Sequence, residues 1–344
     1  MINLRNPGSS LPIKWLFMVC FLLLTFFASL LLGRYIISPL TIIDTLKNSL
    51  FHINPNAFEL EASIVVGIRL PRTILSMLIG ASLAVSGATF QGLFRNPLAS
   101  PDVLGVSSGA GFGAALGILV TGISVMTSLY AFVFGILSVF ITFFLATTRN
   151  QISVISLVLS GMIVSSIFSS LISLIKYVAD PYDKLPAITY WLMGSFSKTT
   201  YEDLKVATLP MVIGILMLLL LRWRINILSL GDEEARLLGV NPVKIRLTTI
   251  ITATIITAVS VTVVGIVGWV GLVIPHISRL LVGVDHKDLL PTSCILGAIF
   301  LTWVDIIART AASVEIPIGI LTALVGAPFF AFLFKSVKKE KGEW

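Results

Sequence analysis

The residues best suited to chemistry are charged side chains that border long apolar runs. Asp305 and Arg309 lie four positions apart, so they share one face of a helix. A charge at the centre of a bilayer costs about 2.5–3.5 kcal/mol, so we expect this pair near a membrane surface, facing protein or water. Arg69 and Arg72 border another apolar run. The three arginines could form structural ion pairs, or they could bind carboxylates of a partner protein, because guanidinium gives directional hydrogen bonds.

The sequence contains no motif typical of metal binding, nucleotide binding or nucleophilic catalysis. His52, His276 and His286 stand far apart with no His-Glu-x-x-His motif, so no metal site is predicted. No Gly-x-x-x-x-Gly-Lys-Ser/Thr phosphate loop occurs, so nucleotide energy would have to come through another chain. No local Ser/His/Asp motif points to an intramembrane enzyme. We therefore expect a chain that is not an enzyme and binds no cofactor of its own.

A glycine-rich segment, Gly109-Ala-Gly-Phe-Gly-Ala114, superficially matches a dinucleotide-binding fingerprint. It lacks a preceding soluble strand and lies in an apolar region, so we interpret the match as spurious. Gly109, Gly113 and Gly117 are spaced four apart, which lets two helices approach closely. The segment therefore predicts helix packing rather than nucleotide binding.

The composition indicates a polytopic helical membrane protein. Of 344 residues, 56% are hydrophobic and 12% are charged, whereas soluble domains carry about 25% charged residues. Cys20 and Cys294 both fall in apolar runs and are interpreted as small buried hydrophobes. The net charge of +7 comes from short loops and tails, where it sets membrane orientation and does not indicate nucleic-acid binding.

The apolar runs predict about ten spans in a single transmembrane domain covering 1–344, with both termini on the cytoplasmic side. A short surface helix is expected from Ser38-Pro39, an exposed loop over 52–62, and a long polar outer stretch over 180–203. A basic tail is expected over 335–344. The expected apolar segments are 15–33, about 72–91, 107–117, 130–147, 156–177, 204–221, 245–264, 265–282, 289–307 and 317–334.

Between two of these runs, Leu228–Pro242 is charged and rich in turn residues. Asp232, Glu233 and Glu234 are placed to begin a short helix, because negative charge is favourable at a helix N-terminus. Ala235, Leu237 and Leu238 would give it an apolar side, and Gly239 would end it in the left-handed conformation. Asn241 and Pro242 are typical of the N-cap and first residue of the next helix. Short cytoplasmic helices over about 229–243 could therefore dock a soluble partner.

Six short motifs occur in order along the chain: Arg69-Leu-Pro-Arg72, Gln91-x-x-x-Arg-Asn-Pro-Leu-Ala99, Gly231-Asp-Glu-Glu-Ala-Arg-x-Leu-Gly239, Gly271-Leu-x-x-Pro-His-x-x-Arg279, Asp305-x-x-Ala-Arg309 and Glu315-x-Pro-x-Gly319. In this order they resemble the FecCD-type permeases of ABC importers for iron-siderophores, haem and vitamin B12. The resemblance covers about 65–334, and Trp269 departs from it where the family more often has Phe.

The resemblance implies a type II ABC importer permease fold that works as a dimer, with a pore along the dimer axis. Two ATPase subunits, which bind ATP and Mg, would bind inside, and a binding protein would dock outside. The family's docking arginines match Arg69, Arg72 and Arg309, and its cytoplasmic gate matches Asn96, Pro97 and Leu98. Its ATPase-coupling segment matches Gly231, Asp232, Glu233, Glu234, Ala235, Arg236, Leu238 and Gly239.

The expected function is therefore a permease subunit in a bacterial inner (cytoplasmic) membrane that imports a metal chelate by alternating access. Ferric siderophore is the first choice of substrate, followed by haem and cobalamin. The alternative is a secondary transporter driven by an ion gradient, although Asp305 is the main carboxylate within the spans and is locally paired with Arg309. A membrane enzyme or scaffold is a third possibility. The sequence leaves open the chelate, homodimer or paralogue pairing, the binding protein and the type of cell envelope.

Overall fold

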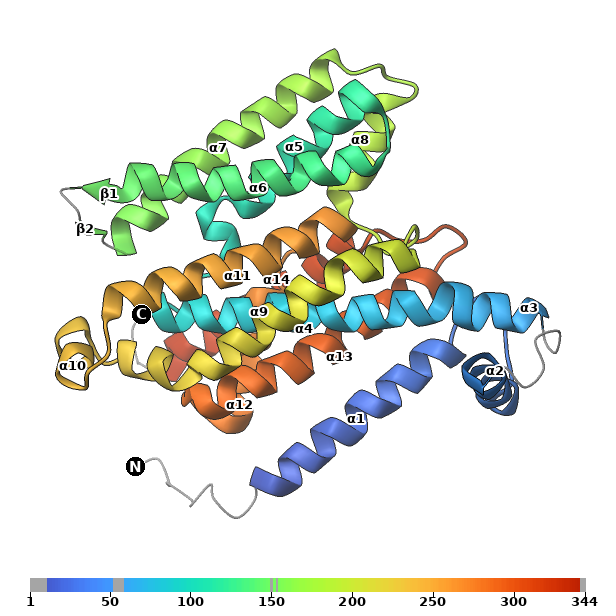
Figure 1. The fold of residues 1–344 in the computed structure, drawn as a ribbon, viewed down its shortest axis with the longest axis horizontal. Helices are drawn as coiled ribbons and strands as arrows, with labels where there is room; N and C mark the ends of the chain where they lie inside the picture. Colours follow the sequence, from blue (N-terminus) through green and yellow to red (C-terminus); the bar gives the residue numbers. More distant parts are fainter. Residues whose placement is uncertain (1–10, 52–58, 149–150, 153, 341–344) are drawn as a thin grey trace.

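A computed structural model describes residues 11–51, 59–148, 151–152 and 154–340 of the chain. Apart from two paired strands of two residues each, β1 (Thr147–Thr148) and β2 (Gln151–Ile152), its regular elements are helices (Figure 1). The helices are α1 (Leu11–Leu31), α2 (Pro39–Phe51), α3 (Glu59–Ala62), the π-helix η2 (Ser63–Arg69), α4 (Leu70–Phe94), the 3-10 helix η3 (Pro101–Leu104), α5 (Val106–Thr121), α6 (Val125–Ala146), α7 (Val154–Val178), α8 (Lys184–Met193), α9 (Tyr201–Leu228), α10 (Asp232–Leu237), α11 (Pro242–Val264), α12 (Val270–Val282), α13 (His286–Thr310) and α14 (Ile318–Glu340).

Seven helical segments in the described residues are long and apolar enough to cross a bilayer. One runs from α3 through η2 and α4, and the others fall in α1, α6, α7, α9, α11 and α13. Three further apolar helical segments, in α5, α12 and α14, are shorter than a usual span. Each of the ten expected apolar segments therefore falls in a helix, but length and composition identify seven of them as candidate spans.

Helix α4 lies at the centre of the bundle, between α9, α11, α12 and α13 (Figure 1). Most of its side chains are buried. It continues η2 and α3 without interruption, so the expected loop over 52–62 is wrong at its end: Glu59–Ala62 is helical, and residues 52–58 lie outside the described residues. Pro71 occupies the first turn of α4, just after the π-helical segment. Since proline has no backbone N–H to donate, a change of hydrogen-bonding register before it is physically reasonable.

Glycines allow the helices around α4 and α5 to pack closely, as the spacing predicts for α5. A Cβ added at Gly113 would lie 2.2 Å from the backbone oxygen of Tyr130 on α6. Gly80 of α4 and Gly297 of α13 face each other in the same manner, and a Cβ on either would lie within 2.3 Å of the other's carbonyl oxygen. These contacts bring backbones together in the way that small residues do in membrane helices.

The structure differs from the sequence prediction at several helix boundaries and in one additional helix. The first apolar helix begins at Leu11 and ends at Leu31, rather than covering 15–33. The polar stretch over 180–203 contains a ten-residue helix, α8, whose Ile188 is buried. The expected basic tail is helical as far as Glu340, the end of α14, and residues 341–344 lie outside the described residues.

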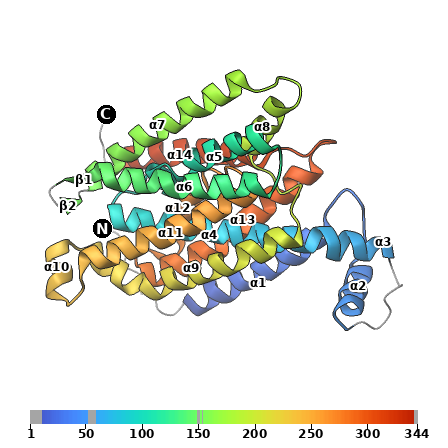
Figure 2. The ribbon, with the colours of Figure 1, turned by 45° about the horizontal axis from the view of Figure 1, so that its top comes forward.

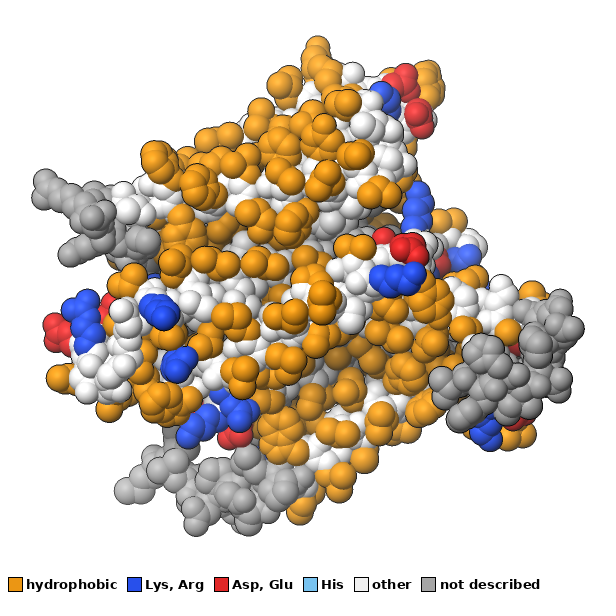
Figure 3. Space-filling model, in the orientation of Figure 1, with side chains coloured by type: hydrophobic (Ala, Val, Ile, Leu, Met, Phe, Trp, Pro, Cys, Tyr) orange, Lys and Arg blue, Asp and Glu red, His pale blue; other side chains and the backbone are white. Residues whose placement is uncertain are grey.

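The bundle has two charged ends, which we call the α10 end and the α2 end (Figures 1 and 2). Helix α1 begins at the α10 end, where Lys14 donates a hydrogen bond to the Leu281 carbonyl at 2.9 Å, and α13 also begins there. Helix α13 ends at the α2 end, where α14 begins. In Figure 3, hydrophobic side chains cover the middle of the visible face, and charged side chains gather toward the ends. This distribution is the one expected of a membrane-embedded bundle.

Candidate functional site

The short helix α10 projects from one end of the bundle, held at both its termini (Figure 2). Asp232, Glu233 and Glu234 form its first turn, as the sequence predicts. Gly239 follows it with φ +74°, a left-handed conformation that glycine adopts without strain. The Asn241 side chain then accepts a hydrogen bond from the Lys244 backbone N–H at 3.1 Å and caps α11. The predicted turn chemistry of this segment is confirmed.

Two contacts anchor α10 to the bundle and leave its tip free. Arg246 of α11 forms an ion pair with Asp232 at 2.7 Å, and Ala235 is fully buried. Leu237 and Leu238 point outward with exposed fractions of 88% and 56%. Of the three residues expected to give α10 an apolar side, Ala235 is therefore buried against the bundle, whereas Leu237 and Leu238 face solvent. Exposed leucines on a rigid, charged projection are typical of a protein contact surface.

The Asn96-Pro97-Leu98 turn lies at the α10 end, directly after α4. The Leu98 backbone N–H donates to the Asn96 side-chain oxygen at 2.9 Å, and the Ala99 N–H donates to the Asn96 carbonyl at 3.1 Å. Arg95, just before the turn, has φ +48°. All four residues of 95–98 are exposed. The turn is thus fixed by its own hydrogen bonds while its side chains remain accessible.

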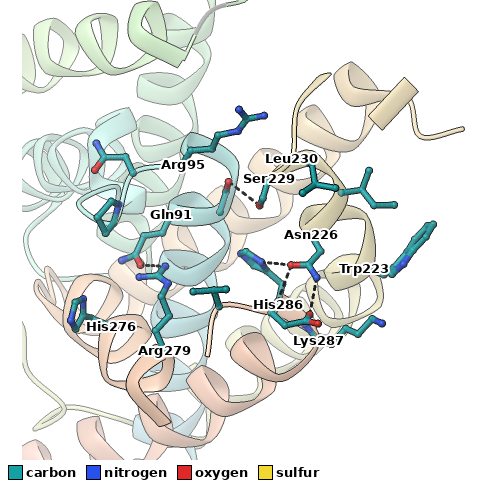
Figure 4. Close-up of a pocket in the computed structure, with 16 residues that line it drawn as sticks. Gln91, Arg95, Trp223, Asn226, Ser229, Leu230, His276, Arg279, His286 and Lys287 are labelled. Carbon is teal, nitrogen blue, oxygen red and sulfur yellow. Dashed lines mark hydrogen bonds between the residues drawn. The ribbon is translucent and has the colours of Figure 1, made fainter. Parts of the chain in front are cut away.

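This turn borders a hollow of about 730 Å³ between the ends of α4, α9, α12 and α13 (Figure 4). Its wall carries polar and cationic side chains: Gln91, Arg95, Asn226, Arg279 and Lys287. Arg279 donates a hydrogen bond to the side-chain oxygen of Gln91, which joins α12 to α4. The sequence motifs contain both residues but gave no sign that they meet.

A second hydrogen-bonded group lines the same hollow at the start of α13 (Figure 4). The Asn226 oxygen accepts from the His286 backbone N–H at 3.1 Å and lies 2.9 Å from His286 Nδ1. The Asn226 amide donates to the Asp285 carboxylate at 2.8 Å, and the same carboxylate oxygen caps α13 through the Lys287 N–H. These bonds fix α9 against α13, so the wall of the hollow is rigid.

At the α2 end, Arg72 uses both edges of its guanidinium within the chain. Its Nε and Nη2 donate to Asp305 of α13 at 2.8–3.1 Å. Its Nη1 and Nη2 donate to Glu315, in the segment between α13 and α14, at 3.0 and 2.9 Å. Arg72 and Asp305 are buried, whereas the Glu315 side chain is 27% exposed. The sequence motifs included Glu315 but assigned it no role.

The other two arginines of this cluster hold the end of α1. Arg69 donates from Nη1 to the carbonyls of Leu30 and Leu31 at 2.6 and 3.0 Å. Arg309 donates to the Ser29 carbonyl at 2.6 Å, and its Nε lies 3.6 Å from an Asp305 oxygen. These donors meet carbonyls that a helix C-terminus leaves unsatisfied.

The structure corrects the expected accessibility of these arginines. It brings Arg69, Arg72 and Arg309 together at one end, as predicted, but all three side chains are buried and bonded inside the chain. They therefore present no open arginine face in this conformation. Of the two readings of Asp305 and Arg309, the structural ion pair is the one observed. Local sequence patterns could not predict the partners of Arg72, because Asp305 and Glu315 lie 233 and 243 positions away from it.

Among the described residues, no group of three or more His, Cys, Asp or Glu side chains could hold a metal ion. His52 lies outside the described residues. The described residues therefore form three features. The exposed helix α10 and the cationic hollow lie at one end of the bundle, and the buried cluster of arginines and carboxylates lies at the other.

A sequence model of the FecCD transport family matches residues 21–336, which is most of the chain. The chain belongs to the FecCD transport family. FecCD chains are the permease components of ABC transporters and are not themselves catalytic. Family membership and the apolar helices together establish a multi-pass membrane protein.

Two curated relatives of this FecCD permease are similar over most of their lengths. The molybdate import system permease protein MolB of Haemophilus influenzae is 41% identical over 92% of this chain and 94% of its own. A probable iron chelatin transport system permease protein of Helicobacter pylori is 43% identical over 78% of this chain and 82% of its own. A solved structure, described as an inward-facing conformation of a metal-chelate type ABC transporter, has a TM-score of 0.84 and 38% identity. It covers 94% of this FecCD chain and 99% of its own.

Proposed function

We propose that this chain is the membrane subunit through which an ABC importer moves a metal chelate or an oxyanion into the cytoplasm. The observation that carries the proposal is α10: it is rigidly capped and anchored, yet displays Leu237 and Leu238 to solvent. An ATPase subunit would bind this surface through residues Gly231 to Gly239 and supply ATP and Mg. Because α10 is tied to α11 by Arg246 and Asp232, a shift of the ATPase would move the bundle with it.

The proposed topology is a single domain over 1–344 with about ten crossings and with both chain termini and α10 in the cytoplasm. The positive-inside rule counts Lys and Arg near span ends, and Lys335, Lys338 and Lys339 at the end of α14 add to the cations of the α10 end and support this orientation. Helices α5, α12 and α14 would cross as short segments packed inside the protein, where shorter or broken helices are tolerated. The α10 end carries Lys14, Arg95, Arg222, Arg224, Arg236, Lys244, Arg246, Arg279 and Lys287.

We further propose a dimer with a second permease subunit, either identical or a paralogue, around a central path. The Asn96-Pro97-Leu98 turn would close the cytoplasmic end of this path. Its backbone is fixed by hydrogen bonds to Asn96, so the turn can move as a unit with α4. Alternating access would follow from rocking of the helices around the path.

A substrate-binding protein would dock at the α2 end. Its carboxylates can reach Arg72 only if Glu315, the more exposed partner, releases that guanidinium. We therefore propose that docking exchanges an internal ion pair for an external one at Arg72. Arg69 and Arg309 would contribute by holding α1 in place.

For the substrate, ferric siderophore remains the first candidate, with haem and cobalamin next. The names of the relatives extend the class of candidate substrates to oxyanions, because one relative is named for molybdate import and another for iron chelatin transport. Both classes are bulky or anionic metal species delivered by a binding protein. Competition of each ligand for uptake in reconstituted vesicles would separate them.

The test is ATP hydrolysis in proteoliposomes that contain this chain, its candidate ATPase, and a loaded or empty binding protein. We expect the loaded binding protein to stimulate hydrolysis and uptake together. The alternative, a secondary transporter, predicts uptake that follows an imposed ion gradient with no ATPase subunit bound. Uptake of that kind would overturn the importer proposal.

A further inference from the structure

The cationic hollow at the α10 end has an unusual balance of charge (Figure 4). Three cations from three different segments line it: Arg95 after α4, Arg279 of α12 and Lys287 of α13. Asp285 is the one carboxylate in the described wall, and its Oδ1 already accepts from the Asn226 amide and the Lys287 N–H. The hollow therefore has an excess of positive charge that no side chain in its wall neutralises.

The three cations also retain unused hydrogen-bond donors. Arg279 donates through Nη2 to Gln91, and Arg95 donates through Nη2 to the Leu228 carbonyl at 3.2 Å. A guanidinium carries five N–H donors in a fixed fork that suits phosphate geometry. Lys287 is exposed in the wall of the hollow, so its ammonium is accessible to a ligand there. An anion with several oxygens would satisfy these groups.

The mouth of the hollow meets an apolar stripe on α9. Trp223 lies at the mouth and is half exposed. Ile213, Leu216 and Leu220 precede it at spacings of three and four on the same face, and all three are exposed. Trp at such a position is typical of the boundary between hydrocarbon and headgroups. A molecule with an anionic head in the hollow could thus lay apolar chains along α9.

We infer that this hollow is a binding site for the headgroup of an anionic phospholipid such as phosphatidylglycerol. The phosphate would accept hydrogen bonds from Arg95, Arg279 and Lys287, and the acyl chains would follow the exposed face of α9 past Trp223. Basic pockets between transmembrane helices are known to favour anionic headgroups. A volume of about 730 Å³ is large enough for a headgroup with its glycerol. The bound lipid would link α4, α9, α12 and α13 at the end that carries α10.

The continuity with α9 favours a lipid over two other occupants. A free phosphate would use the cations but gain nothing from the apolar stripe. An ATPase carboxylate would come from the side of α10, whereas the stripe leads from the middle of the bundle to the mouth at Trp223.

The test uses the full chain purified in detergent, with bound lipids counted by native mass spectrometry. The probes are phosphatidylglycerol, phosphatidylcholine with the same acyl chains, and soluble glycerol 3-phosphate. The variant is Arg95→Gln with Lys287→Gln, both exposed residues. The matched control is Arg224→Gln with Lys244→Gln, which removes the same charge from the same end outside the wall of the hollow.

We expect phosphatidylglycerol to bind more tightly than phosphatidylcholine, and the hollow variant to weaken it by roughly 25-fold, about fivefold for each cation. The control should keep its affinity, and both variants should keep the thermal midpoint of unfolding of the lipid-free chain. Equal affinity for the two lipids would overturn the inference. So would displacement of the lipid by glycerol 3-phosphate at a similar concentration, which would indicate a phosphate site. Displacement by the ATPase subunit, with loss of that subunit from the hollow variant, would indicate a protein contact instead.

Discussion

Arg72 of α4 and Asp305 of α13 form a buried pair in which Nε and Nη2 of the arginine donate to the carboxylate at 2.8–3.1 Å. Asp305 has no exposed surface, and the same carboxylate lies 3.6 Å from Arg309 Nε. The pair joins two helices whose backbones already meet at Gly80 and Gly297. Packing and charge therefore fix the same helix pair.

Removing one member of this pair should be strongly destabilising, because the charge of the buried partner is left behind. We expect Asp305→Asn to lower the free energy of unfolding by about 3–5 kcal/mol, because it leaves Arg72 and Arg309 buried with less compensation. Arg72→Met combined with Asp305→Leu should cost less than the sum of the single changes. The measurement is a double-mutant cycle of unfolding in mixed micelles.

The exposed pair Lys205 and Glu202 provides the control for that cycle. Their side chains are mostly exposed and lie 2.8 Å apart. Lys205→Gln should leave the unfolding midpoint nearly unchanged, since exposed ion pairs contribute little. Additive single changes at Arg72 and Asp305 would show that the two residues do not act as a pair.

Glu315 should limit the availability of Arg72 to a docking carboxylate. Glu315→Gln keeps the side-chain shape but removes one of the two negative partners of Arg72. If docking exchanges this ion pair, affinity for the binding protein should rise about fivefold, the equivalent of about 1 kcal/mol. Binding is measured with the chain immobilised in nanodiscs, and Glu202→Gln serves as the control. An unchanged or lower affinity would leave Arg72 with a structural role alone.

The exposed tip of α10 should be required for ATPase binding and dispensable for folding. Glu234→Lys with Leu238→Asp places a reversed charge and a new charge on this surface, since Leu238 is 56% exposed. We expect an unchanged thermal midpoint and at least a tenfold loss of the co-purified ATPase subunit, because a charge buried at a contact is costly.

The matched control for α10 makes the same kinds of change at the α2 end. Glu202→Lys and Tyr182→Asp alter exposed residues far from α10. This variant should retain the ATPase subunit. Normal ATPase binding and uptake by the α10 variant would remove the coupling role from Gly231 to Gly239.

The parts of this structure that local chemistry controls were predictable from the sequence. Gly239 has the left-handed conformation and Asn241 caps α11, because both depend on neighbours within four residues. The apolar runs likewise give the helices, although the boundaries shift where polar residues occur inside a helix. Helix α8 was missed because ten residues in a polar stretch carry no strong periodic signal.

The network at the α2 end was not predictable, because its members meet only in the folded bundle. Arg72 reaches Asp305 and Glu315 across more than 230 positions of sequence. The prediction that the three arginines lie together is confirmed, but the possibility that they form a face open to a partner's carboxylates is not what the structure shows. A buried charge must find a partner, so the presence of Asp305 and Glu315 in the motifs was the available signal.

The glycine spacing of α5 leads to a final prediction about packing against α6. Gly113→Ala would place a Cβ 2.2 Å from the Tyr130 carbonyl oxygen, and a backbone atom can yield only if the helices separate. We expect a loss of about 1–3 kcal/mol in the free energy of unfolding, measured in mixed micelles. Gly268→Ala is the control, because a Cβ there meets no atom within 4 Å. Equal stability of the two variants would show that α5 and α6 do not depend on this close approach, and that the four-residue glycine spacing reflects something other than packing.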